Sequence, residues 1–303
     1  MLGTRVLSGL SLIAVVLGVL LLDEWLAPWF PFWFVFSLLT LGAAAFELVG
    51  LLGATDARPS MNSVLGGVAA LVVANWIPHL TDSLLAASQS VPIAYEPAAP
   101  INVLSWPLLT FVGVLMVSFI VQSVQFIKPG RTMGTIAGTM LAVAYVGLLG
   151  SFIIQMRWLE GAYHGVMPLV FLFATAKGAD TGAYALGRLA GRHKLWPRLS
   201  PNKTIEGAIG GMVFAVGASL ITAAVSRQVF RISTLDWPAA VGFGLVVGSL
   251  AQLGDLMESM IKRDCQKKDS SSAVPGFGGV LDVLDSLLFA SPVAYGFWVT
   301  LGP

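Results

Sequence analysis

The chain has 303 residues, of which 56% are hydrophobic and only 11% are charged, and its formal net charge is +1. Soluble domains carry about 25% charged residues, and apolar runs long enough to cross a bilayer recur along this sequence. The composition excludes a soluble globular protein and predicts an all-α, polytopic integral membrane protein. The single cysteine, Cys265, excludes an intramolecular disulfide, and with three histidines the sequence offers no soft-metal site.

Nine apolar stretches are predicted to be transmembrane helices. The first resembles a signal peptide in one respect, because Arg5 precedes an apolar run. However, Asp23 and Glu24 follow it where a small-residue cleavage site is expected, so we favour an uncleaved span. The nine predicted spans are 6–22, 29–46, 63–81, 104–126, 133–155, 165–186, 207–225, 238–254 and 287–301.

The distribution of positive charge predicts the orientation of these spans. With nine spans, fourteen of the 17 Lys and Arg residues fall on the side of the N-terminus, and cytoplasmic loops carry such an excess. The segment 82–103 on the other side contains Asp82 and Glu96 and no Lys or Arg. We therefore expect a cytoplasmic N-terminus, an external C-terminus and charge-dense loops that all face the cytoplasm.

Pairs of glycines spaced by four residues recur in the second half of the chain. They indicate close helix–helix packing. No internal repeat is evident, which argues against an inverted-repeat transporter. The pairs are Gly178/Gly182, Gly187/Gly191, Gly207/Gly211 and Gly244/Gly248.

The first polar stretch, "KGADTGAYALGRLAGRHKL" at 177–195, places an acid near the end of an apolar span. This acid is Asp180, and Tyr184 and Arg188 follow on its face at helical spacing. A charge at mid-bilayer costs about 2.5–3.5 kcal/mol on insertion scales, so Asp180 needs a partner, a metal or water. The alternative is an interfacial Asp that caps a helix.

The second polar stretch, "SPNKTIEG" at 200–207, lies just ahead of the seventh span. Ser200 and Thr204 are suited to cap the free amides of a helix start, which also attracts phosphate. Lys203 adds a full positive charge there. The alternative is ordinary capping beside a lysine that reaches the interface.

The third polar stretch, "GDLMESMIKRDCQKKDSSSAVPGFGGVLDVLDS" at 254–286, begins with a helical stripe of polar residues. Asp255, Ser259 and Lys262 fall at i, i+4 and i+7, on one face leading out of the membrane. Arg263 and Lys268 extend this positive charge, and the serine run 270–272 reads as a short flexible loop.

The same stretch ends in a second set of acids after a Pro- and Gly-rich turn. Asp282 and Asp285, at i and i+3, share a face of the helix that opens there. Carboxylate oxygens near ammonium and guanidinium groups suit Mg²⁺ together with phosphates. The alternative, a solvated loop that contacts anionic lipids, explains the basic residues but not the acids on apolar helix ends.

Together the three stretches resemble the phosphatidate cytidylyltransferase (CDP-diacylglycerol synthase) family over about residues 165–290. The family signature runs Ser-x-x-Lys-Arg, four residues, Lys-Asp, a small-residue loop, Pro, then His-Gly-Gly-x-x-Asp-Arg-x-Asp. Two positions depart from it, because Phe277 replaces the usual His and Val283 replaces the usual Arg. In register are Ser259, Lys262, Arg263, Lys268, Asp269, Pro275, Gly278, Gly279, Asp282 and Asp285.

The resemblance implies a reaction of CTP with phosphatidic acid that gives CDP-diacylglycerol and pyrophosphate at the cytoplasmic face of a bacterial cell membrane. It also implies Mg²⁺ and a second cation, contact with membrane lipids, a homodimer and no nucleic-acid partner. Residues 1–160 would be a transmembrane scaffold and 161–303 the catalytic region.

Individual roles follow for the residues of the three stretches. As a hypothesis, Asp255 and Asp282 ligate Mg²⁺, while Asp285 and Asp180 hold a second cation or ordered water; Lys262 and Arg263 complete the catalytic set. Substrate binding is assigned to Ser200, Lys203, Thr204, Ser259, Lys268, Arg188 and Tyr184.

Three other readings stay open on the sequence alone. A transporter would use intramembrane acids as an ion path, but the acids gather at one face. A CDP-alcohol phosphotransferase would show Asp-Gly-x-x-Ala-Arg ahead of two further acids, and no such string occurs. A catalytically silent relative that binds lipid or nucleotide is compatible with Phe277 and Val283.

Overall fold

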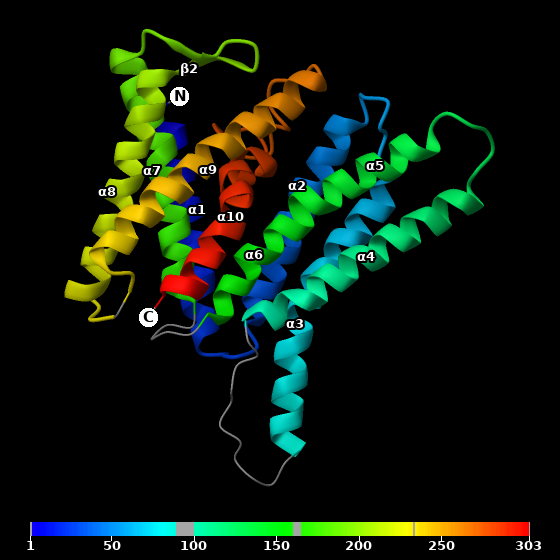
Figure 1. Cartoon of the computed structure of the whole chain (residues 1–303), viewed down its shortest axis with the longest axis horizontal. Helices are drawn as coiled ribbons and strands as arrows, with labels where there is room; N and C mark the ends of the chain where they lie inside the picture. The colour runs from blue at the N-terminus through cyan, green and yellow to red at the C-terminus, as the bar shows by residue number, and fades with distance from the viewer. Residues whose placement is uncertain (1, 89–99, 160–164, 233, 303) are drawn as a thin grey trace. The chain divides into compact units, whose positions relative to one another are not determined.

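The computed structural model describes residues 2–88, 100–159, 165–232 and 234–302, and these are mostly helical (Figure 1). The predicted segment around Glu96 lies outside the described residues. The elements in chain order are α1 (Leu2–Glu24), α2 (Pro31–Leu52), α3 (Met61–Ser88), α4 (Pro100–Val124), α5 (Thr132–Ala142), η1 (Val143–Leu148), α6 (Leu149–Gln155), η2 (Met156–Trp158), α7 (Val166–Ala190), β1 (Lys194–Trp196), β2 (Ser200–Thr204), α8 (Ile205–Gln228), α9 (Trp237–Asp264) and α10 (Val280–Leu301).

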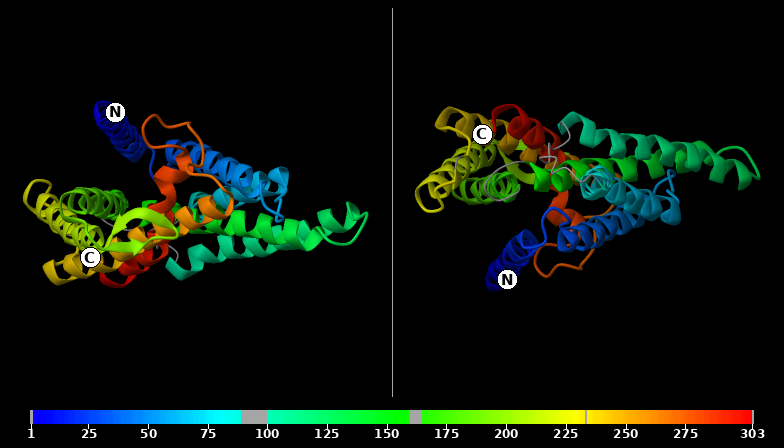
Figure 2. Two further views of the ribbon diagram at one scale, coloured as in Figure 1. Left: turned by 90° about the horizontal axis from the view of Figure 1, so that it is seen from above. Right: turned by 90° about the horizontal axis from the view of Figure 1, so that it is seen from below.

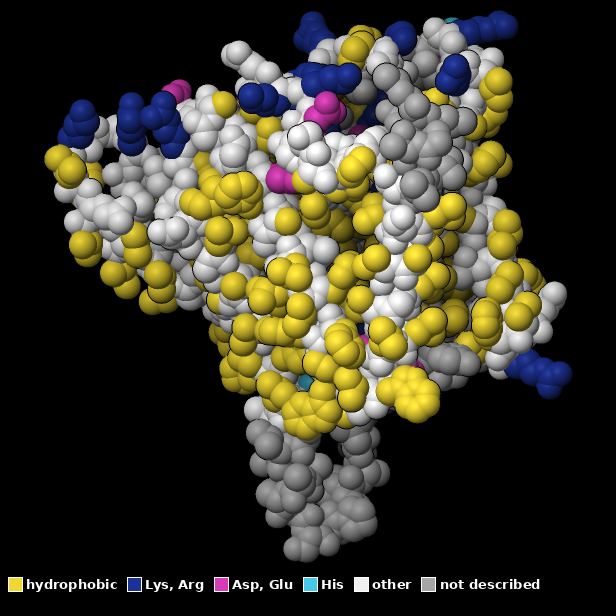
Figure 3. Space-filling view, turned by 180° about the vertical axis from the view of Figure 1, so that it is seen from behind, with side chains coloured by type: hydrophobic (Ala, Val, Ile, Leu, Met, Phe, Trp, Pro, Cys, Tyr) yellow, Lys and Arg dark blue, Asp and Glu magenta, His cyan; other side chains and the backbone are white. Residues whose placement is uncertain are grey.

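Seven helical segments of the described chain are long and apolar enough to cross a membrane. This confirms the prediction of an all-α integral membrane protein. The predicted spans 6–22 and 165–186 correspond to α1 and α7, which are not among the seven, so the number nine stays a prediction. Hydrophobic side chains cover much of the face shown in Figure 3. The seven segments are Pro31–Leu52, Met61–Thr81, Val103–Val124, Thr132–Trp158, Ile205–Gln228, Trp237–Asp264 and Val280–Leu301.

The chain forms two compact units, each of which takes in a second segment from elsewhere in the sequence. The first contains Met1–Gln155 and Ser270–Leu281, and the second contains Met156–Asp269 and Asp282–Pro303. The division expected from the sequence, a scaffold at 1–160 and a catalytic region at 161–303, stays a prediction.

A buried polar network joins α3 to α6 in the first unit. Asn75 donates to the Ser151 hydroxyl (2.9 Å), and Gln155 donates to the Asn75 side-chain oxygen (3.0 Å). The Gln155 oxygen lies 3.2 Å from a ring nitrogen of His79. Because polar groups among apolar helices are costly when unpaired, these mutual bonds fix how α3 and α6 pack.

Small residues let α7, α8 and α9 approach each other closely in the second unit. A side chain at Gly211 would lie 2.9 Å from the Ala179 carbonyl oxygen of α7, and one at Gly244 would lie 2.6 Å from Val216 of α8. The glycine pairs thus serve helix packing within the chain, as the sequence indicated. Edge-to-face rings join α10 to this group, with Phe171 and Trp298 at 5.3 Å between centroids.

A short antiparallel hairpin, β1 and β2, connects α7 to α8 and was not expected from the sequence. It lies at the ends of these two helices (Figures 1 and 2). Glu206, in the first turn of α8, accepts hydrogen bonds from the backbone N–H groups of Arg192 (3.0 Å) and His193 (3.2 Å). Its carboxylate also contacts the His193 ring at 2.6 Å. These contacts hold the start of the hairpin against α8.

Candidate functional site

The second unit contains a cavity of about 560 Å³ to which all three polar stretches contribute. This volume is in the range that binds small molecules. Eight predicted site residues line it: Asp180, Tyr184, Arg188, Lys203, Thr204, Asp255, Asp282 and Asp285. The other lining residues are Ala183, Gly187, Leu195, Asn202, Gly207, Ala208, Gln252 and Leu256.

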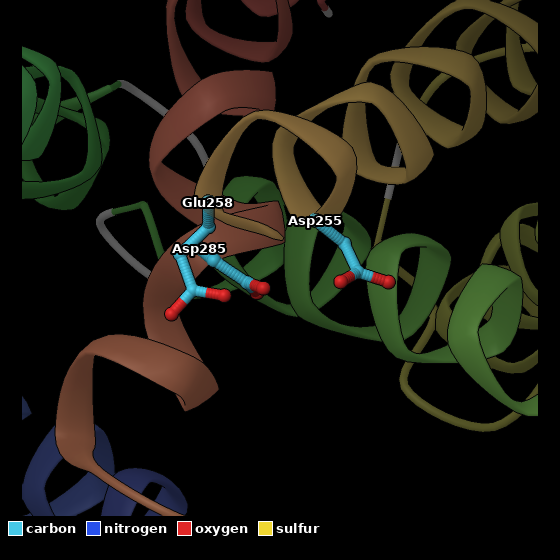
Figure 4. A group of neighbouring side chains, drawn as sticks. All are labelled: Asp255, Glu258 and Asp285. Carbon is cyan, nitrogen blue, oxygen red and sulfur yellow. The ribbon is translucent and has the colours of Figure 1, made fainter. Parts of the chain in front are cut away.

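Three carboxylates converge beside this cavity. Asp255 and Glu258 come from α9 and Asp285 comes from α10, and one oxygen of each lies within 4.8 Å of the others. Figure 4 shows the three side chains directed toward a common space. Glu258 is fully buried and Asp285 nearly so. The sequence reasoning missed Glu258, although it lies three residues after Asp255 and four before Lys262, on the same helical stripe.

Lysines from two elements are paired with these acids. Lys262 contacts Glu258 on its own helix, and its ammonium donates to the Asp282 carboxylate at 2.8 Å. Lys203, from β2, lies 2.6 Å from Asp255. Asp282 was expected beside Asp255 and is paired with Lys262. The carboxylates that lie beside Asp255 are those of Glu258 and Asp285. The assignment of Asp282 and Asp180 to a metal stays a prediction.

A further cation, Lys177 on α7, reaches the first turns of α10. Its ammonium donates to the Asp180 carboxylate (3.0 Å), the Val283 carbonyl oxygen (3.1 Å) and the Ser286 hydroxyl (3.1 Å). Asp180 therefore has the charged partner that its position near an apolar span required. From the sequence Lys177 appeared only as one of many basic residues at the interface. Its spacing of three from Asp180 was the available signal.

The residues at the hairpin side of the cavity hold each other by local hydrogen bonds. Arg188 donates to the Tyr184 hydroxyl at 2.9 Å, and both side chains are exposed. Thr204 is the N-cap of α8, and its hydroxyl accepts a hydrogen bond from the Gly207 N–H at 3.1 Å. The capping interpretation of this stretch is confirmed for Thr204, while Ser200 lies in β2.

Five predicted site residues do not line the cavity: Ser200, Ser259, Lys262, Arg263 and Lys268. Arg263 donates to the carbonyl oxygens of Leu199 (3.3 Å) and Lys267 (3.2 Å), which links α9 to the hairpin. Ser259 is buried and Lys268 is exposed. Their roles in substrate binding remain predictions.

Cys265 follows the basic end of α9 and is almost fully buried. Burial, together with the neighbouring charge of Asp264, raises the pKa of its thiol. A thiol held protonated is a poor nucleophile and a poor metal ligand.

The two positions that depart from the family signature have different surroundings. Phe277 lies in the loop of the first unit between Gly276 (φ +84°) and Gly278 (φ +107°). A side-chain carbon at Gly9 of α1 would lie 3.6 Å from its ring. Val283 uses its carbonyl oxygen to accept the Lys177 ammonium. A cation therefore lies at this turn of α10 although no Arg is present there.

Comparison with known proteins places the chain in a family. The family model described as "Cytidylyltransferase family" matches residues 3–301. The chain belongs to the cytidylyltransferase family. A Staphylococcus epidermidis protein named phosphatidate cytidylyltransferase is 38% identical over 182 residues, which cover 60% of this chain and 66% of that protein.

Two further relatives carry the same name. The Staphylococcus saprophyticus protein is 36% identical and the Staphylococcus aureus protein 38% identical, with the same coverage of 60% and 66%. The matched stretch spans just under two thirds of the length of these relatives. The resemblance predicted from the three polar stretches is confirmed at the level of the family.

The acidic group has the chemistry of a divalent-cation site. Asp255, Glu258 and Asp285 offer only carboxylate oxygens, the ligands that Mg²⁺ prefers. Magnesium sites typically use one or two carboxylates and leave positions for water and phosphate oxygens. The neighbouring cavity, lined by Lys203 and Arg188, provides the room and the positive charge for such phosphates.

Proposed function

We propose that this chain transfers the cytidylyl group of CTP to phosphatidic acid, giving CDP-diacylglycerol and pyrophosphate. The observation that carries the proposal is the cavity where carboxylates of α9 and α10 meet the lysines of β2 and α9, in a chain of the cytidylyltransferase family. The relatives named phosphatidate cytidylyltransferase support the choice of phosphatidic acid as the acceptor.

The reaction needs little proton transfer from the protein. A phosphomonoester has a second pKa of about 6, so the phosphate of phosphatidic acid is largely dianionic at neutral pH and no general base is required. One of its oxygens attacks the α-phosphorus of CTP, and a new phosphorus–oxygen bond forms. The bond from that phosphorus to the oxygen of the β-phosphate breaks, and pyrophosphate leaves with the electron pair. The protein must therefore align two anions and stabilise the charge that develops.

Lys203 and Arg188, which line the cavity, and Lys262 beside it supply this stabilisation. Lys203 and Lys262 are paired with carboxylates, and these ion pairs give the two ammonium groups defined positions. When the triphosphate enters, its oxygens take the place of the carboxylates as partners of Lys203 and Lys262. Arg188, which Tyr184 orients, binds a further phosphate oxygen from the hairpin side.

Two of the carboxylates that lose these lysines, Asp255 and Glu258, belong to the acidic group suited to hold Mg²⁺. Asp255, Glu258 and Asp285 would hold the ion, and Asp282 and Asp180 are the candidates for a second one. A bound Mg²⁺ supplies neutralisation and alignment of phosphate oxygens. Once Lys203 and Lys262 bind phosphate oxygens, the carboxylates of Asp255 and Asp282 are free to bind the cation.

Lys177 takes the part that the signature gives to an Arg between the two acids of α10. Its ammonium lies between Asp180 and the Val283 carbonyl oxygen, and it also holds Ser286. These bonds place a positive charge beside α10 and fix the turn that carries Asp282 and Asp285. The replacement of Arg by Val at 283 is therefore compatible with activity.

We further propose nine transmembrane spans, with the N-terminus and the cavity on the cytoplasmic side. The charge distribution in the sequence supports this orientation, and it suits the substrates, since CTP is cytosolic and phosphatidic acid presents its head group at the interface. The acyl chains would remain in the lipid. A homodimer stays a prediction, because the glycine pairs that permit one are engaged within the chain.

The test is an assay of the purified protein in detergent with labelled CTP, phosphatidic acid and Mg²⁺. We expect CDP-diacylglycerol and one pyrophosphate per turnover, and no product when Mg²⁺ is chelated. Absence of product with wild-type protein, while control lipids and nucleotides are intact, would contradict the proposal. The same preparation in liposomes distinguishes a transporter, which would move an ion or solute without consuming CTP.

A further inference from the structure

A glutamate in the first unit, Glu47 of α2, holds the loop that leads into α10. Its side chain is only 8% exposed. One oxygen accepts hydrogen bonds from the Ser271 hydroxyl (2.6 Å) and the Val280 N–H (3.0 Å). The other accepts from the Ser270 hydroxyl (3.0 Å) and the Leu281 N–H (2.8 Å). Each carboxylate oxygen thus binds one hydroxyl and one backbone amide.

The two backbone amides are those at the start of a helix. The first N–H groups of an α-helix have no partner within it and need one from elsewhere. Val280 and Leu281 are the first two residues of α10, and Glu47 supplies that partner from α2. A carboxylate is also favoured there by the helix dipole, and charge-assisted hydrogen bonds are stronger than neutral ones. Glu47 therefore defines where α10 begins.

The loop is closed tightly around this carboxylate. A side chain at Gly279 would collide with the Ser270 hydroxyl and with the Glu47 carboxylate. Within the loop, the Val274 N–H donates to the Gly278 carbonyl oxygen at 2.7 Å, and the Gly278 N–H donates back at 3.1 Å. The serines predicted to form a flexible loop are therefore fixed at Ser270 and Ser271. No spacing within 254–286 indicated a partner more than 200 residues earlier.

We infer that Glu47 is a positioning residue for the reaction, acting through the start of α10. Leu281, whose amide it binds, is directly followed by Asp282, and Asp285 lies one turn further along the same helix. Loss of the anchor frees the first turn of α10 and with it the direction of the Asp282 and Asp285 carboxylates. The inference rests on the proposed function. The claim that Glu47 holds the start of α10 can be tested without measuring turnover.

The chain offers a matched control in Asp23, another buried carboxylate that binds the start of a helix. Asp23 accepts hydrogen bonds from the N–H groups of Phe32 (3.0 Å) and Trp33 (2.6 Å) at the start of α2. It is fully buried, and although α2 also carries Glu47, that residue lies several turns beyond the capped start and makes its own hydrogen bonds to α10. Asp23→Asn should therefore reproduce the loss of a buried helix cap without disturbing α10.

The experiment compares wild type, Glu47→Gln, Glu47→Asp, Asp23→Asn and the double variant Ser270→Ala/Ser271→Ala, each purified as a monodisperse species. Glu47→Gln keeps the shape but turns an NH₂ group toward one serine hydroxyl and one backbone N–H, and this N–H then loses its acceptor. We expect its kcat per folded protein to fall by about 10–100-fold, and the Mg²⁺ concentration for half-maximal activity to rise, as for other residues that orient metal ligands. The KM for CTP should change less than kcat. Glu47→Asp, which keeps the charge, should recover part of the activity.

Two measurements separate positioning from a purely structural role. Hydrogen exchange should be faster at Val280 and Leu281 in Glu47→Gln and unchanged there in Asp23→Asn. Binding of Mn²⁺, followed by electron paramagnetic resonance, should weaken in Glu47→Gln alone. The serine double variant should fall between, because the two backbone bonds remain. If Glu47→Gln retained wild-type kcat and Mn²⁺ affinity per folded molecule, the inference would be overturned.

Failure of the proposed function would look different. A wild-type protein that makes no CDP-diacylglycerol overturns the proposed reaction. Exchange at Val280 and Leu281 and Mn²⁺ affinity would then still decide whether Glu47 sets the start of α10 and the acidic group beyond it.

Discussion

Two buried glutamates, Glu47 in the first unit and Glu258 in the second, are stabilised in opposite ways. Glu47 is surrounded by neutral donors, two hydroxyls and two backbone amides. Glu258 is paired with the ammonium of Lys262 and lies within 4.8 Å of Asp255 and Asp285. Both solve the same problem, since a buried carboxylate without partners is costly.

The difference separates a fixed anchor from an exchangeable contact. The four donors of Glu47 all belong to the loop and to the start of α10, and all four bind this one carboxylate. The ammonium of Lys262 already divides its contacts between Glu258 and Asp282, so it can move to an incoming phosphate oxygen. Neutral donors thus hold the Glu47 carboxylate in one position. An ammonium shared by two carboxylates can leave them, and each carboxylate can then bind a cation.

The largest effect is expected from Asp282→Asn, which removes an exchangeable carboxylate at the cavity. We expect turnover to fall by roughly 10²–10³-fold or more, because groups that face developing charge contribute that much each. The protein should still be folded, since Asn keeps the shape and can accept from Lys262. CDP-diacylglycerol formation by a monodisperse preparation is the measurement. Robust CTP-dependent activity would remove Asp282 from the site.

Breaking the Lys262 pair should cost both activity and stability. Lys262→Met leaves Glu258 buried without its cation, and removal of one partner from a buried pair costs about 3–5 kcal/mol. The double variant Lys262→Met/Glu258→Gln removes both charges, so it should recover much of the thermal stability but none of the activity. Thermal unfolding in detergent, followed beside CTP turnover, tests this. A double variant as unstable as the single one would contradict the pairing.

Lys177 tests whether a cation beside α10 can come from another helix. Lys177→Met should lower kcat by about 10-fold, comparable with the loss of an orienting residue, and Lys177→Arg should retain more activity. Adding Val283→Arg to Lys177→Met returns a cation to the turn that Lys177 contacts, and kcat should rise again. Steady-state kinetics of the three variants decide this. If neither Lys177→Arg nor Lys177→Met/Val283→Arg had a higher kcat than Lys177→Met, a positive charge alone could not replace Lys177.

The smallest effect is expected at Thr204, where the structure favours a cap over a substrate ligand. Thr204→Val removes the acceptor for the Gly207 N–H and should cost about 1 kcal/mol of stability, as for other N-caps. Thr204→Ser should behave as wild type. The KM for CTP should be unchanged in both. A large rise of KM in Thr204→Val, without a loss of stability, would restore the substrate-binding assignment.

Much of the site could be predicted because its residues follow local helical spacing. The acids of α9 and α10 and the lysine ahead of α8 come from short stretches in which i, i+3 and i+4 relations place side chains on one face. The same reasoning applied to 255–262 would have found Glu258. The sequence also indicated Thr204 as a cap and the glycines of α7 and α8 as packing positions.

The remainder depends on contacts that no local pattern carries. The partners of Glu47 lie 223 to 234 residues away, so its role requires the three-dimensional fold. Lys177 contacts Val283 and Ser286, which lie 106 and 109 residues further along the chain. The hydrogen bonds of Arg263 to the carbonyl oxygens of Leu199 and Lys267 could not be predicted from the sequence either, and its role in catalysis stays a prediction. The hairpin itself is too short to show an alternating pattern.

The close backbone contact between α7 and α8 limits which substitutions this sequence can accept. A methyl group at Gly182 would collide with the Gly210 carbonyl oxygen and the Phe214 side chain, and one at Gly211 would press on Gln252. In a saturation library these positions should tolerate almost nothing larger than glycine, although Gly182, Gly210 and Gly211 are not among the residues that line the cavity. We therefore expect substitutions at the α7–α8 contact to be tolerated as poorly as substitutions at the cavity. Substitutions on the lipid-facing sides of the helices should be tolerated well.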